Sequence, residues 1–535
     1  ARKKTVAALE AQELIRSKTP YEHVVGYDYK SGLPIEPLIK DQWFIKIQPL
    51  AQRAKKAIEN GEVSFTPESG KRDLIRYFDQ LRDWNLSRQI PWGIPIPAFQ
   101  NVNDPQDWIY NESVDEKTIE IDGKIYRREE DTFDTWFSSG QWPFIVTDYL
   151  QKGKLSRFYP NSVMETAGDI LFAWVARMIM MGLYVTDQVP FKHVYLNGLL
   201  LDEKGQKMSK SKGNVISPVE TIAEYGSDAL RLGIIANRSA RQNQAFSTGR
   251  VVAGRNFCNK LWNIARFAEN KLGEGFRKTV PEPKTLADHW IMRELSAAIT
   301  DIGSQIENYR FAEASETMYH AIWDNVADWY VEASKQQNNP SMLAWVLDTS
   351  LKIAHPFAPF VTETIWQTLL WHNDMLITTK WPEKVAYDDI AAAEFGRLKH
   401  LIAEVRFVIS ELPGNQRYNL LYQNDSLIAD NANLIKRLAK LKDVQAVDQA
   451  RGLRLANSGR EAWLDVSAKT ISEHESNLEV RLAEAQALIK TLKARLLNEN
   501  YIAKAPAELV AETKTQLEQK QALVERLIHE LDVLK

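Results

Sequence analysis

The chain has 535 residues, 44% of them hydrophobic and 26% charged, which is ordinary for a globular protein of roughly three or four domains. The net charge of −3 gives no overall basic field for a nucleic acid, so any RNA contact must come from local patches. The single cysteine, Cys258, excludes a disulfide framework and a cysteine-rich zinc site, and its apolar helical pattern predicts a buried structural thiol.

The first part of the chain mixes short elements with turns. Residues 1 to about 18 are predicted to be helical, Asp41–Ile45 to be a short strand, and residues 47–60 to be a second helix. Residues 100–130 are polar and carry a hairpin signal at Asp122-Gly123, so we interpret them as an insertion. The chain starts at Ala1 in the middle of a pattern and shows no signal peptide, and we interpret it as part of something longer.

A strand–helix–strand unit follows. A strand is predicted to end at Val163–Thr166, a helix to run from Gly168-Asp169 to about Tyr184, and His193–Leu201 to form a buried second strand. In an open parallel sheet the ligand lies at the carboxyl ends of the strands, where Asp169 and the segment 202–214 are both expected. Asp169 suits two roles equally, as a helix cap or as an acceptor from ribose hydroxyls or an amino group.

The helix of this unit is the most apolar one in the sequence. It covers about Ile170 to Val185, contains Arg177, and is predicted to be too short to span a bilayer. We therefore expect no membrane association.

The segment after the second strand carries the run Lys207-Met208-Ser209-Lys210-Ser211, between Gly205 and Gly213, which let it bend and move. Its lysines and hydroxyls can give a triphosphate counter-charge and hydrogen-bond donors. A loop of this composition is most often solvated surface. Placed after a strand in an α/β pattern, however, the five-residue string resembles the signature loop of the class I aminoacyl-tRNA synthetases.

The remainder of the chain is mainly helical. One helix is predicted from Pro218 to about Leu232. From Arg250 on, helical spacing predicts a bundle with segments at 250–271, 285–308, 311–336, 341–354 and 359–373. Four of its aromatic side chains are interpreted as core rather than as base-stacking platforms: Trp262, Trp323, Trp329 and Trp366. Residues 385–466 are weakly patterned and predict a small mixed α/β connector.

Two heptad patterns end the chain. Apolar residues alternate in steps of four and three over Leu478–Leu496 and again over Val510–Leu534, with Thr513 and Lys520 as polar interruptions. A proline-bearing turn at 498–506 separates them, so the pattern predicts an antiparallel coiled-coil hairpin. This hairpin could be a structural arm, or its scattered lysines and arginines could lie along an RNA backbone.

Several stretches together resemble the valyl-tRNA synthetases, in the right order and over essentially the whole chain. They are Asp134–Ser139, Trp174–Met180, Lys207–Ser211, Arg255–Trp262, His355–Phe360 and the 498–506 turn with its flanking helices. The terminal coiled coil separates the valine enzymes from their isoleucine and leucine relatives. The family's other signature, His-x-Gly-His, occurs nowhere in the sequence. The resemblance thus implies the carboxyl-terminal portion of such an enzyme, without the first half of the catalytic fold and without the editing domain.

The resemblance implies α/β and all-α parts in five domains. Residues 1–75 would be the exit of the editing insertion with a connecting segment, and 76–249 the second half of a Rossmann-like catalytic domain. Residues 250–385 would be the anticodon-binding bundle, 386–466 an α/β connector, and 467–535 a coiled-coil arm that binds tRNA. Half of a parallel sheet would expose an unpaired edge, so we expect the isolated chain to aggregate or to pair with a partner.

The implied activity is ATP-dependent formation of valyl-adenylate and transfer of valine to tRNA(Val), in the cytoplasm, with Mg²⁺ accompanying ATP. The missing half, possibly a separate chain, would be needed for full activity. By resemblance, Lys207, Lys210 and Ser209 are catalytic, with Lys210 the foremost contact to the departing pyrophosphate. The implied ATP-binding residues are Lys207, Met208, Ser209, Lys210, Ser211, Gly168, Asp169, Asn197 and Gly198. The implied walls of the valine pocket are Trp136, Ile170 and Trp174, and no residue is assigned to a metal.

The sequence also departs from the family. Asn85, Pro91 and Ile94 stand where relatives usually carry Cys, an aromatic residue and His, and Asn197 stands where they carry His, which bears on the contact to adenine. One alternative is a non-catalytic tRNA-binding remnant. The missing His-x-Gly-His favours it, whereas the intact loop at Lys207–Ser211 (the lysine loop) and the pocket residues Trp136 and Trp174 oppose it. Another is an isoleucine or leucine enzyme.

Overall fold

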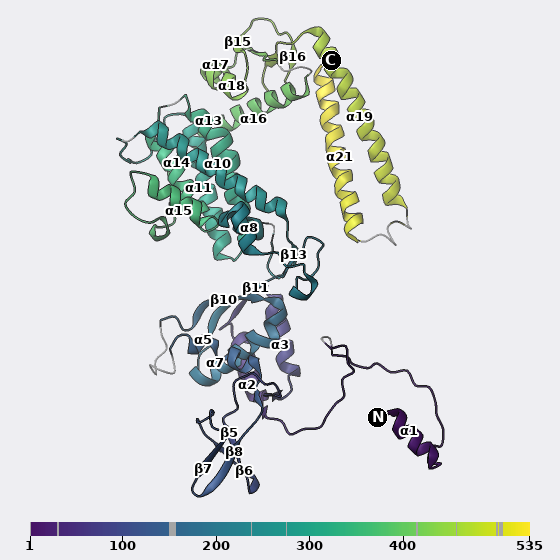
Figure 1. Ribbon diagram of the computed structural model, residues 1–535. Coiled ribbons are helices and arrows are strands. Elements are labelled where there is room, and N and C mark those ends of the chain that lie inside the picture. The colour runs from purple at the N-terminus through teal and green to yellow at the C-terminus, as the bar shows by residue number, and fades with distance from the viewer. Residues whose placement is uncertain are drawn as a thin grey trace. The chain divides into compact units, whose positions relative to one another are not determined.

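The computed structural model describes residues 2–28, 31–148, 157–236, 238–273, 275–336, 338–412, 416–455, 457–498, 501 and 507–534. The chain divides into two compact units, and Figure 1 labels many of their helices and strands. The first unit comprises Ala1–Ser64, Lys71–Met164 and Ile170–His193, and the second comprises Phe65–Gly70, Glu165–Asp169 and Val194–Lys535. The five predicted domain boundaries remain predictions.

The first unit begins with a helix that is shorter than predicted. Helix α1 covers Arg2–Ala11 and does not continue to residue 18. None of its residues is buried, and a short helix without tertiary packing is marginal in water. The predicted strand and second helix are confirmed as β1 (Phe44–Ile45), which pairs antiparallel with β3 (Trp84–Asn85), and α2 (Gln48–Glu59).

The predicted hairpin region forms a small antiparallel sheet in the order β6-β5-β8-β7. Its strands are β5 (Ala98–Asn101), β6 (Asp104–Tyr110), β7 (Thr118–Ile121) and β8 (Lys124–Arg128). Asp122 and Gly123 have φ values of 52° and 74° and form the two-residue turn between β7 and β8. Positive φ at both positions is what such a hairpin turn requires, so the hairpin at Asp122-Gly123 is confirmed.

The strand–helix–strand unit is also present. Strands β2 (Ser64–Thr66), β10 (Asn161–Ala167) and β11 (Phe191–Asn197) form one sheet in the order β10-β11-β2. Between β10 and β11 lie a 3-10 turn η1 (Gly168–Ile170), a π-helix η2 (Leu171–Val175) and α7 (Ala176–Thr186). The remaining short elements of this region are α3 (Ser69–Gln80), β4 (Ser87–Arg88), β9 (Thr132–Phe133), α4 (Thr135–Gly140) and α5 (Trp142–Ile145).

The second strand of that unit stops earlier than predicted. It ends at Asn197, and Leu200–Leu201 form a separate strand, β12, which pairs in parallel with β13 (Gln244–Ala245). The break falls at Gly198, whose backbone lies against the backbone of Gln242 and Asn243. This close approach diverts the chain from the sheet.

The apolar helix is longer than the sequence predicted. Its three helical segments run continuously from Gly168 to Thr186, and these 19 residues are long and apolar enough to cross a membrane by length and composition. The sequence-based estimate was too short because it left out the first turn and the last residue. The strands on either side of the helix, β10 and β11, are neighbours in one sheet, which is the connectivity of a helix that packs on a sheet.

In the second unit, a glycine divides one predicted helix into two. Helices α8 (Pro218–Tyr225) and α9 (Ser227–Ile235) are separated by Gly226, which has a φ of 95°. A residue in this region of φ cannot continue a right-handed helix. The single helix predicted from Pro218 to Leu232 is therefore wrong.

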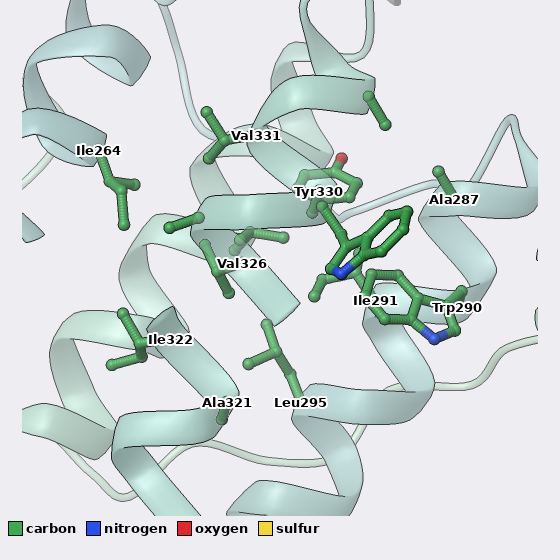
Figure 2. Packing of buried hydrophobic residues seen from close by; sticks show 14 of the residues in the cluster. Ile264, Ala287, Trp290, Ile291, Leu295, Ala321, Ile322, Val326, Tyr330 and Val331 are labelled. Atoms are coloured by element: carbon green, nitrogen blue, oxygen red, sulfur yellow. The ribbon is translucent and has the colours of Figure 1, made fainter. Parts of the chain in front are cut away.

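The predicted helix bundle is confirmed. It consists of α10 (Thr248–Leu272), α11 (Leu286–Glu307), α12 (Phe311–His320), a π-helix η4 (Ala321–Tyr330), α13 (Val331–Ser334), α14 (Pro340–Ala354) and α15 (Pro359–Thr368). Figure 2 shows part of its core, in which Trp290, Ile291 and Leu295 of α11 pack with Val326 and Tyr330 of η4.

Two interpretations of single residues in α10 need correction. Trp366, Trp329 and Trp323 belong to the core or pack against it, as predicted, but Trp262 is 40% exposed. Cys258 is half-buried rather than buried. Burial still raises the pKa of its thiol to about 12, so the thiol is not a reactive one.

The connector has the predicted mixed α/β character. After the short 3-10 turn η5 (Leu376–Thr378), which still belongs to the predicted bundle segment, the connector contains α16 (Asp389–Glu411), α17 (Ser426–Asp430) and α18 (Ala432–Leu438). Its strands, β14 (Asn419–Tyr422), β15 (Asp443–Ala446), β16 (Leu453–Arg454) and β17 (Ala462–Leu464), form a sheet in the order β15-β14-β17-β16.

Two long helices end the chain, α19 (Ala468–Leu497) and α21 (Ala507–Leu534). Leu478 and Leu482, in the first half of α19, pack with Leu523, Leu527 and Leu531 in the last part of α21, so the helices run in opposite directions. These leucines, Leu523 excepted, occupy predicted heptad positions. Most of the predicted turn at 498–506 lies outside the described residues.

Candidate active site and RNA-facing surfaces

The lysine loop follows β12 in the second unit and is built on a tight turn. The main-chain N–H of Asp202 donates to the carbonyl of Gln206 at 2.9 Å, and Leu201 pairs with Lys207 in an isolated bridge. The Asp202 carboxylate also accepts from the main-chain N–H groups of Lys204 and Gln206, at 3.0 and 2.7 Å. Gly205 turns the chain with a φ of 75°. These contacts set the direction in which Lys207 leaves the turn.

Lys207 reaches the other predicted strand end. Its Nζ lies 3.4 Å from Asp169 Oδ2, and both side chains remain substantially exposed, at 68% and 43%. Asp169 sits in η1, directly after β10, whereas Lys207 belongs to the loop after β12. The structure therefore brings Asp169 together with one residue of the segment 202–214, both of which the strand-end argument placed at strand ends, although 37 residues lie between Asp169 and Lys207 in the sequence.

The rest of the loop runs from an extended residue into a short turn. Ser209 is extended, with φ −150° and ψ 147°, and Lys210–Lys212 form a single 3-10 turn that ends at Gly213 with a φ of 66°. Met208 is half-buried and Lys210 is exposed. The side chain of Ser211 lies outside the described residues. Lys210 thus presents its ammonium group to solvent on the same loop as Lys207.

Asn214 ties this loop together. Its Oδ1 accepts from the main-chain N–H of Ser209 at 2.9 Å, and its Nδ2 donates to Asp202 Oδ2 at 2.8 Å and to the Lys207 carbonyl at 3.3 Å. Main-chain hydrogen bonds, foremost that from Gln206, and the amide of Asn214 lower the pKa of Asp202. Sequence reasoning missed both residues, although each is one of the short polar residues that commonly close loops.

Asn197 and Gly198 occupy the end of β11. The Asn197 amide donates to the Glu165 carboxylate, and Arg238 donates to the Gly198 carbonyl. Gly198 has no room for a side chain, because a Cβ would lie 1.9 Å from the Gln242 carbonyl oxygen. Gly168 also faces a close neighbour, the side chain of Arg241. A ligand can therefore approach the backbone of Gly168 and Gly198 closely only from the sides that these neighbours do not cover.

A cavity of about 360 Å³ adjoins Asn197 in the second unit. Two aromatic rings, Tyr195 and Phe311, lie on its wall with centroids 5.3 Å apart. Glu165 and Arg238 contribute charges of opposite sign. Such a mixture of ring faces and hydrogen-bonding groups suits a nucleoside better than it suits a purely apolar molecule.

The three residues of the predicted amino-acid pocket, Trp136, Ile170 and Trp174, all lie in the first unit, and Ile170 directly follows Asp169 in η1. Trp136 and Trp174 are half-buried, and the indole Nε1 of Trp174 donates to the Ser139 carbonyl at 2.9 Å. Trp174 belongs to the π-helix η2, whose wider turn frees main-chain carbonyls. Arg177 donates to two of them, those of Phe172 and Ala173, at 2.8 and 2.9 Å. The hydrogen bond to Ser139 orients the indole of Trp174, and the bonds of Arg177 stabilise the helix that carries it.

Asp134 organises the aromatic cluster next to Trp136. It is 5% exposed and caps α4 by accepting from the Trp136 main-chain N–H. Its carboxylate also accepts from Trp84 Nε1 at 2.9 Å and pairs with Arg88 at 2.8 Å. Arg177 stacks on the Trp84 ring at 4.4 Å. Sequence reasoning missed this network because its members are spread over more than ninety residues.

The described parts of the chain contain no group of three or more His, Cys, Asp or Glu residues that could hold a metal ion.

One face of α10 carries exposed basic, amide and aromatic side chains. Five exposed side chains recur at helical spacing along it: Arg255, Asn259, Trp262, Asn263 and Arg266. They combine two positive charges, two amides and an exposed indole, and no acidic residue interrupts them. Arginine, amide and aromatic side chains are the groups that bind unstacked bases and phosphates of RNA loops. The helical spacing would have revealed this face had Trp262 not been assigned to the core.

Three models of known protein families match parts of the chain. The model of the class I tRNA synthetases for isoleucine, leucine, methionine and valine matches residues 4–247. The anticodon-binding domain of tRNA ligases matches residues 288–417, and the tRNA-binding arm of valyl-tRNA synthetases matches residues 471–535.

Individual relatives point the same way. The valine–tRNA ligase of Thermotoga maritima is 35% identical over 98% of this chain and 62% of its own length, and that of Petrotoga mobilis is 34% identical over 99% and 64%. Mycobacterium tuberculosis methionyl-tRNA synthetase, solved with methionyl-adenylate, shares the fold with a TM-score of 0.50 at 16% identity, over 64% of this chain and 65% of its own. The chain spans somewhat over three fifths of the length of these valine–tRNA ligases, and it belongs to their family among the class I tRNA synthetases.

Proposed function

We propose that the chain carries the carboxyl-terminal part of a valine–tRNA ligase, which activates valine with ATP and transfers it to tRNA(Val). The observation that carries the proposal is the meeting of Lys207 with Asp169 at 3.4 Å. A phosphate-binding cation and an acceptor for ribose hydroxyls lie side by side after two strands of an α/β fold. ATP carries its polyphosphate and its ribose in the same way, one next to the other.

In the proposed reaction, a carboxylate oxygen of valine attacks the α-phosphorus of ATP. The bond to the β-phosphate oxygen breaks in line, and pyrophosphate leaves with the electron pair. The step needs little proton transfer, so the protein contributes positioning and charge. Lys207 and Lys210 would stabilise the negative charge that grows on the pyrophosphate, with Lys210 the principal contact and Ser209 donating a hydrogen bond. Mg²⁺, bound with ATP, would supply further positive charge.

The adenosine would lie against Gly168, Asp169, Asn197 and Gly198. Asn197 replaces the usual histidine, and its amide can still offer both a donor and an acceptor. Met208 and Ser211 would complete the ATP-binding loop. Binding of ATP requires Lys207 to exchange Asp169 for phosphate, because the ion pair occupies the groups that both need.

Valine would enter a pocket walled by Trp136, Ile170 and Trp174. Rigid aromatic walls exclude side chains larger than that of valine by steric contact. The Ser139 and Asp134 contacts support this reading, since they lock the indole of Trp174 and the start of α4. An isoleucine substrate would need an additional methylene's worth of space.

tRNA(Val) would contact the chain at two places. The α10 face offers Arg255, Trp262 and Arg266 to an unpaired loop, and we assign it to the anticodon. Helices α19 and α21 would form an antiparallel coiled coil whose basic residues follow the RNA backbone. A cytoplasmic location fits these partners.

The first half of the catalytic fold is the remaining requirement. The 535 residues contain no His-x-Gly-His, and they cover only 62% of the length of the Thermotoga maritima valine–tRNA ligase. We propose that a segment outside these residues, in the same or a second chain, completes the site. In the completed enzyme, Lys210→Ala should raise the activation barrier by about 2–4 kcal/mol, the usual cost of one preorganised contact. Wild-type exchange of pyrophosphate by this variant would refute the assigned role.

A tRNA-binding protein without chemistry is the second candidate, and the missing His-x-Gly-His favours it. It predicts tight tRNA binding and no adenylate formation under any complementation. The lysine loop and the pocket tryptophans speak for the enzyme, because a protein that only binds tRNA has no use for them.

A further inference from the structure

Asn214 is the residue of the lysine loop whose contacts the proposed chemistry does not use. It lies beyond the signature run, yet its amide touches three separate parts of the loop: the stem at Asp202, the carbonyl of Lys207 and the N–H of Ser209. Gly213 makes this possible, because its φ of 66° turns the chain back toward the lysines.

We infer that Asn214 and Asp202 act as positioning residues, a clasp that holds Lys207 and Lys210 in the geometry needed for pyrophosphate departure. The inference rests on the proposed function. Asp202 alone would form an ordinary turn, through its bonds to the N–H groups of Lys204 and Gln206. The bond of 2.8 Å from Asn214 closes that turn onto the far end of the loop, twelve residues later.

The clasp acts on the main chain around the lysines. Asn214 holds the carbonyl of Lys207 and the N–H of Ser209, so the main chain is tied at two points between the two lysines. Lysine side chains are long and flexible, so a tied main chain narrows the range of positions that the two ammonium groups take around one polyphosphate. Displacement of catalytic groups by about 1 Å can lower a rate by about 100-fold.

Asp202 serves the clasp without neutralising the lysines. Its carboxylate accepts three hydrogen bonds from neutral donors, two main-chain N–H groups and the Asn214 amide. The ammonium groups of Lys207 and Lys210 therefore stay available for phosphate, apart from the contact of Lys207 with Asp169.

The test exchanges the two partners. Asn214→Asp keeps the acceptor for the Ser209 N–H but sets two carboxylates against each other. In the double variant Asp202→Asn/Asn214→Asp, the new amide at 202 can donate to the new carboxylate at 214, and its oxygen can still accept from the turn. Only the longer bond of 3.3 Å to the Lys207 carbonyl is not restored. Asn308→Ala is the matched control, since it removes one amide-to-carbonyl bond of 2.7 Å in the helix bundle.

The first readout needs only the chain itself. Trypsin cleaves after lysine, and the loop contains Lys204, Lys207, Lys210 and Lys212. Loss of one or two net hydrogen bonds should speed cleavage in Asn214→Asp by about five- to tenfold. The double variant should return toward the wild-type rate, and Asn308→Ala should cleave there at the wild-type rate. Equal cleavage of wild type and Asn214→Asp would overturn the clasp.

The second readout is valine-dependent pyrophosphate exchange by the completed enzyme. Asn214→Asp should lower kcat by about 10- to 100-fold with a smaller change in KM for ATP, and the double variant should recover most of the loss. If Lys207→Ala abolishes exchange while Asn214→Asp keeps the wild-type kcat, the positioning role fails and the proposed function stands. Absence of exchange in the wild type, with the trypsin pattern as predicted, would instead reject the proposed function and with it the positioning role.

Discussion

Gly198 is the position where a single added carbon should do the most damage to the candidate active site. In Gly198→Ala, the new Cβ would stand 1.9 Å from the Gln242 carbonyl oxygen, 2.1 Å from its carbon and 2.6 Å from the Asn243 nitrogen. All three neighbours are main-chain atoms, so no side-chain rotation can relieve the clash. The two segments must separate by about 1.5 Å before ordinary contact distances return.

The separation would break the contacts that join the two segments. The Leu199 N–H donates to Asn243 Oδ1 at 2.8 Å, and the N–H groups of Gln244 and Phe246 donate to the carbonyls of Leu199 and Leu201 at 3.0 and 2.9 Å. At about 1 kcal/mol each, their loss amounts to about 3 kcal/mol. Overpacking of a well-filled site costs a similar amount, about 1–3 kcal/mol. We therefore expect local destabilisation of about 2–4 kcal/mol.

Amide hydrogen exchange measures this local effect directly. The amides of Leu199, Gln244 and Phe246 should exchange about 30- to 700-fold faster in Gly198→Ala, as long as they open by local unfolding. Gly249→Ala is the matched control, because its Cβ would meet only Ser247 Oγ at 3.6 Å on an exposed helical turn. That change should leave these amides as they are. Unchanged exchange in Gly198→Ala would refute the argument from the close backbone approach.

Three further predictions follow from other parts of the chain. The buried carboxylate of Asp348, 3% exposed, accepts hydrogen bonds from His372 and Trp371 and forms an ion pair with Lys278. Asp348→Ala should therefore lower the free energy of unfolding in urea by about 3–5 kcal/mol, and a loss below about 1 kcal/mol would contradict the pairing. Because burial raises the pKa of the Cys258 thiol to about 12, this thiol should react with iodoacetamide at pH 8 about a thousandfold more slowly than a free thiol. Unfolding should make it reactive, and rapid labelling of the folded chain would contradict the prediction. Trp262→Ala should weaken the binding of tRNA(Val) by about 1–3 kcal/mol in filter binding, whereas substitution of another exposed tryptophan, Trp92→Ala, should leave the affinity unchanged. Equal affinities of the two variants would show that the α10 face is not part of the RNA site.

The strand-end argument explains why part of the candidate site was predictable. Topology alone placed Asp169 and the segment 202–214 at the ends of two strands, and the structure sets Lys207 of that segment 3.4 Å from Asp169. Hydrophobic periodicity likewise gave the bundle helices and the apolar contacts between α19 and α21. These signals are local or periodic, and a single sequence records them.

The features that could not be predicted from the sequence depend on tertiary contacts. The strand at 193–201 reads as one apolar run, and only the neighbouring backbone at Gln242 shows why it breaks at Gly198. Gly226 divides a helix whose apolar spacing continues on both sides. Asp134 and Asn214 are ordinary polar residues in the sequence, and their roles depend on partners that folding brings to them. Trp262 looked like core because helical spacing does not say which face is covered.

Valine-dependent exchange of pyrophosphate into ATP tests the central claim most directly. It should be measured for this chain alone and after addition of a segment containing His-x-Gly-His, with valine, isoleucine and threonine as substrates and Lys210→Ala as the inactive control. The account predicts exchange in the mixture, strongest with valine and lost in Lys210→Ala. No exchange in the mixture, with tRNA binding retained, would contradict it and leave a protein that binds tRNA without activating an amino acid.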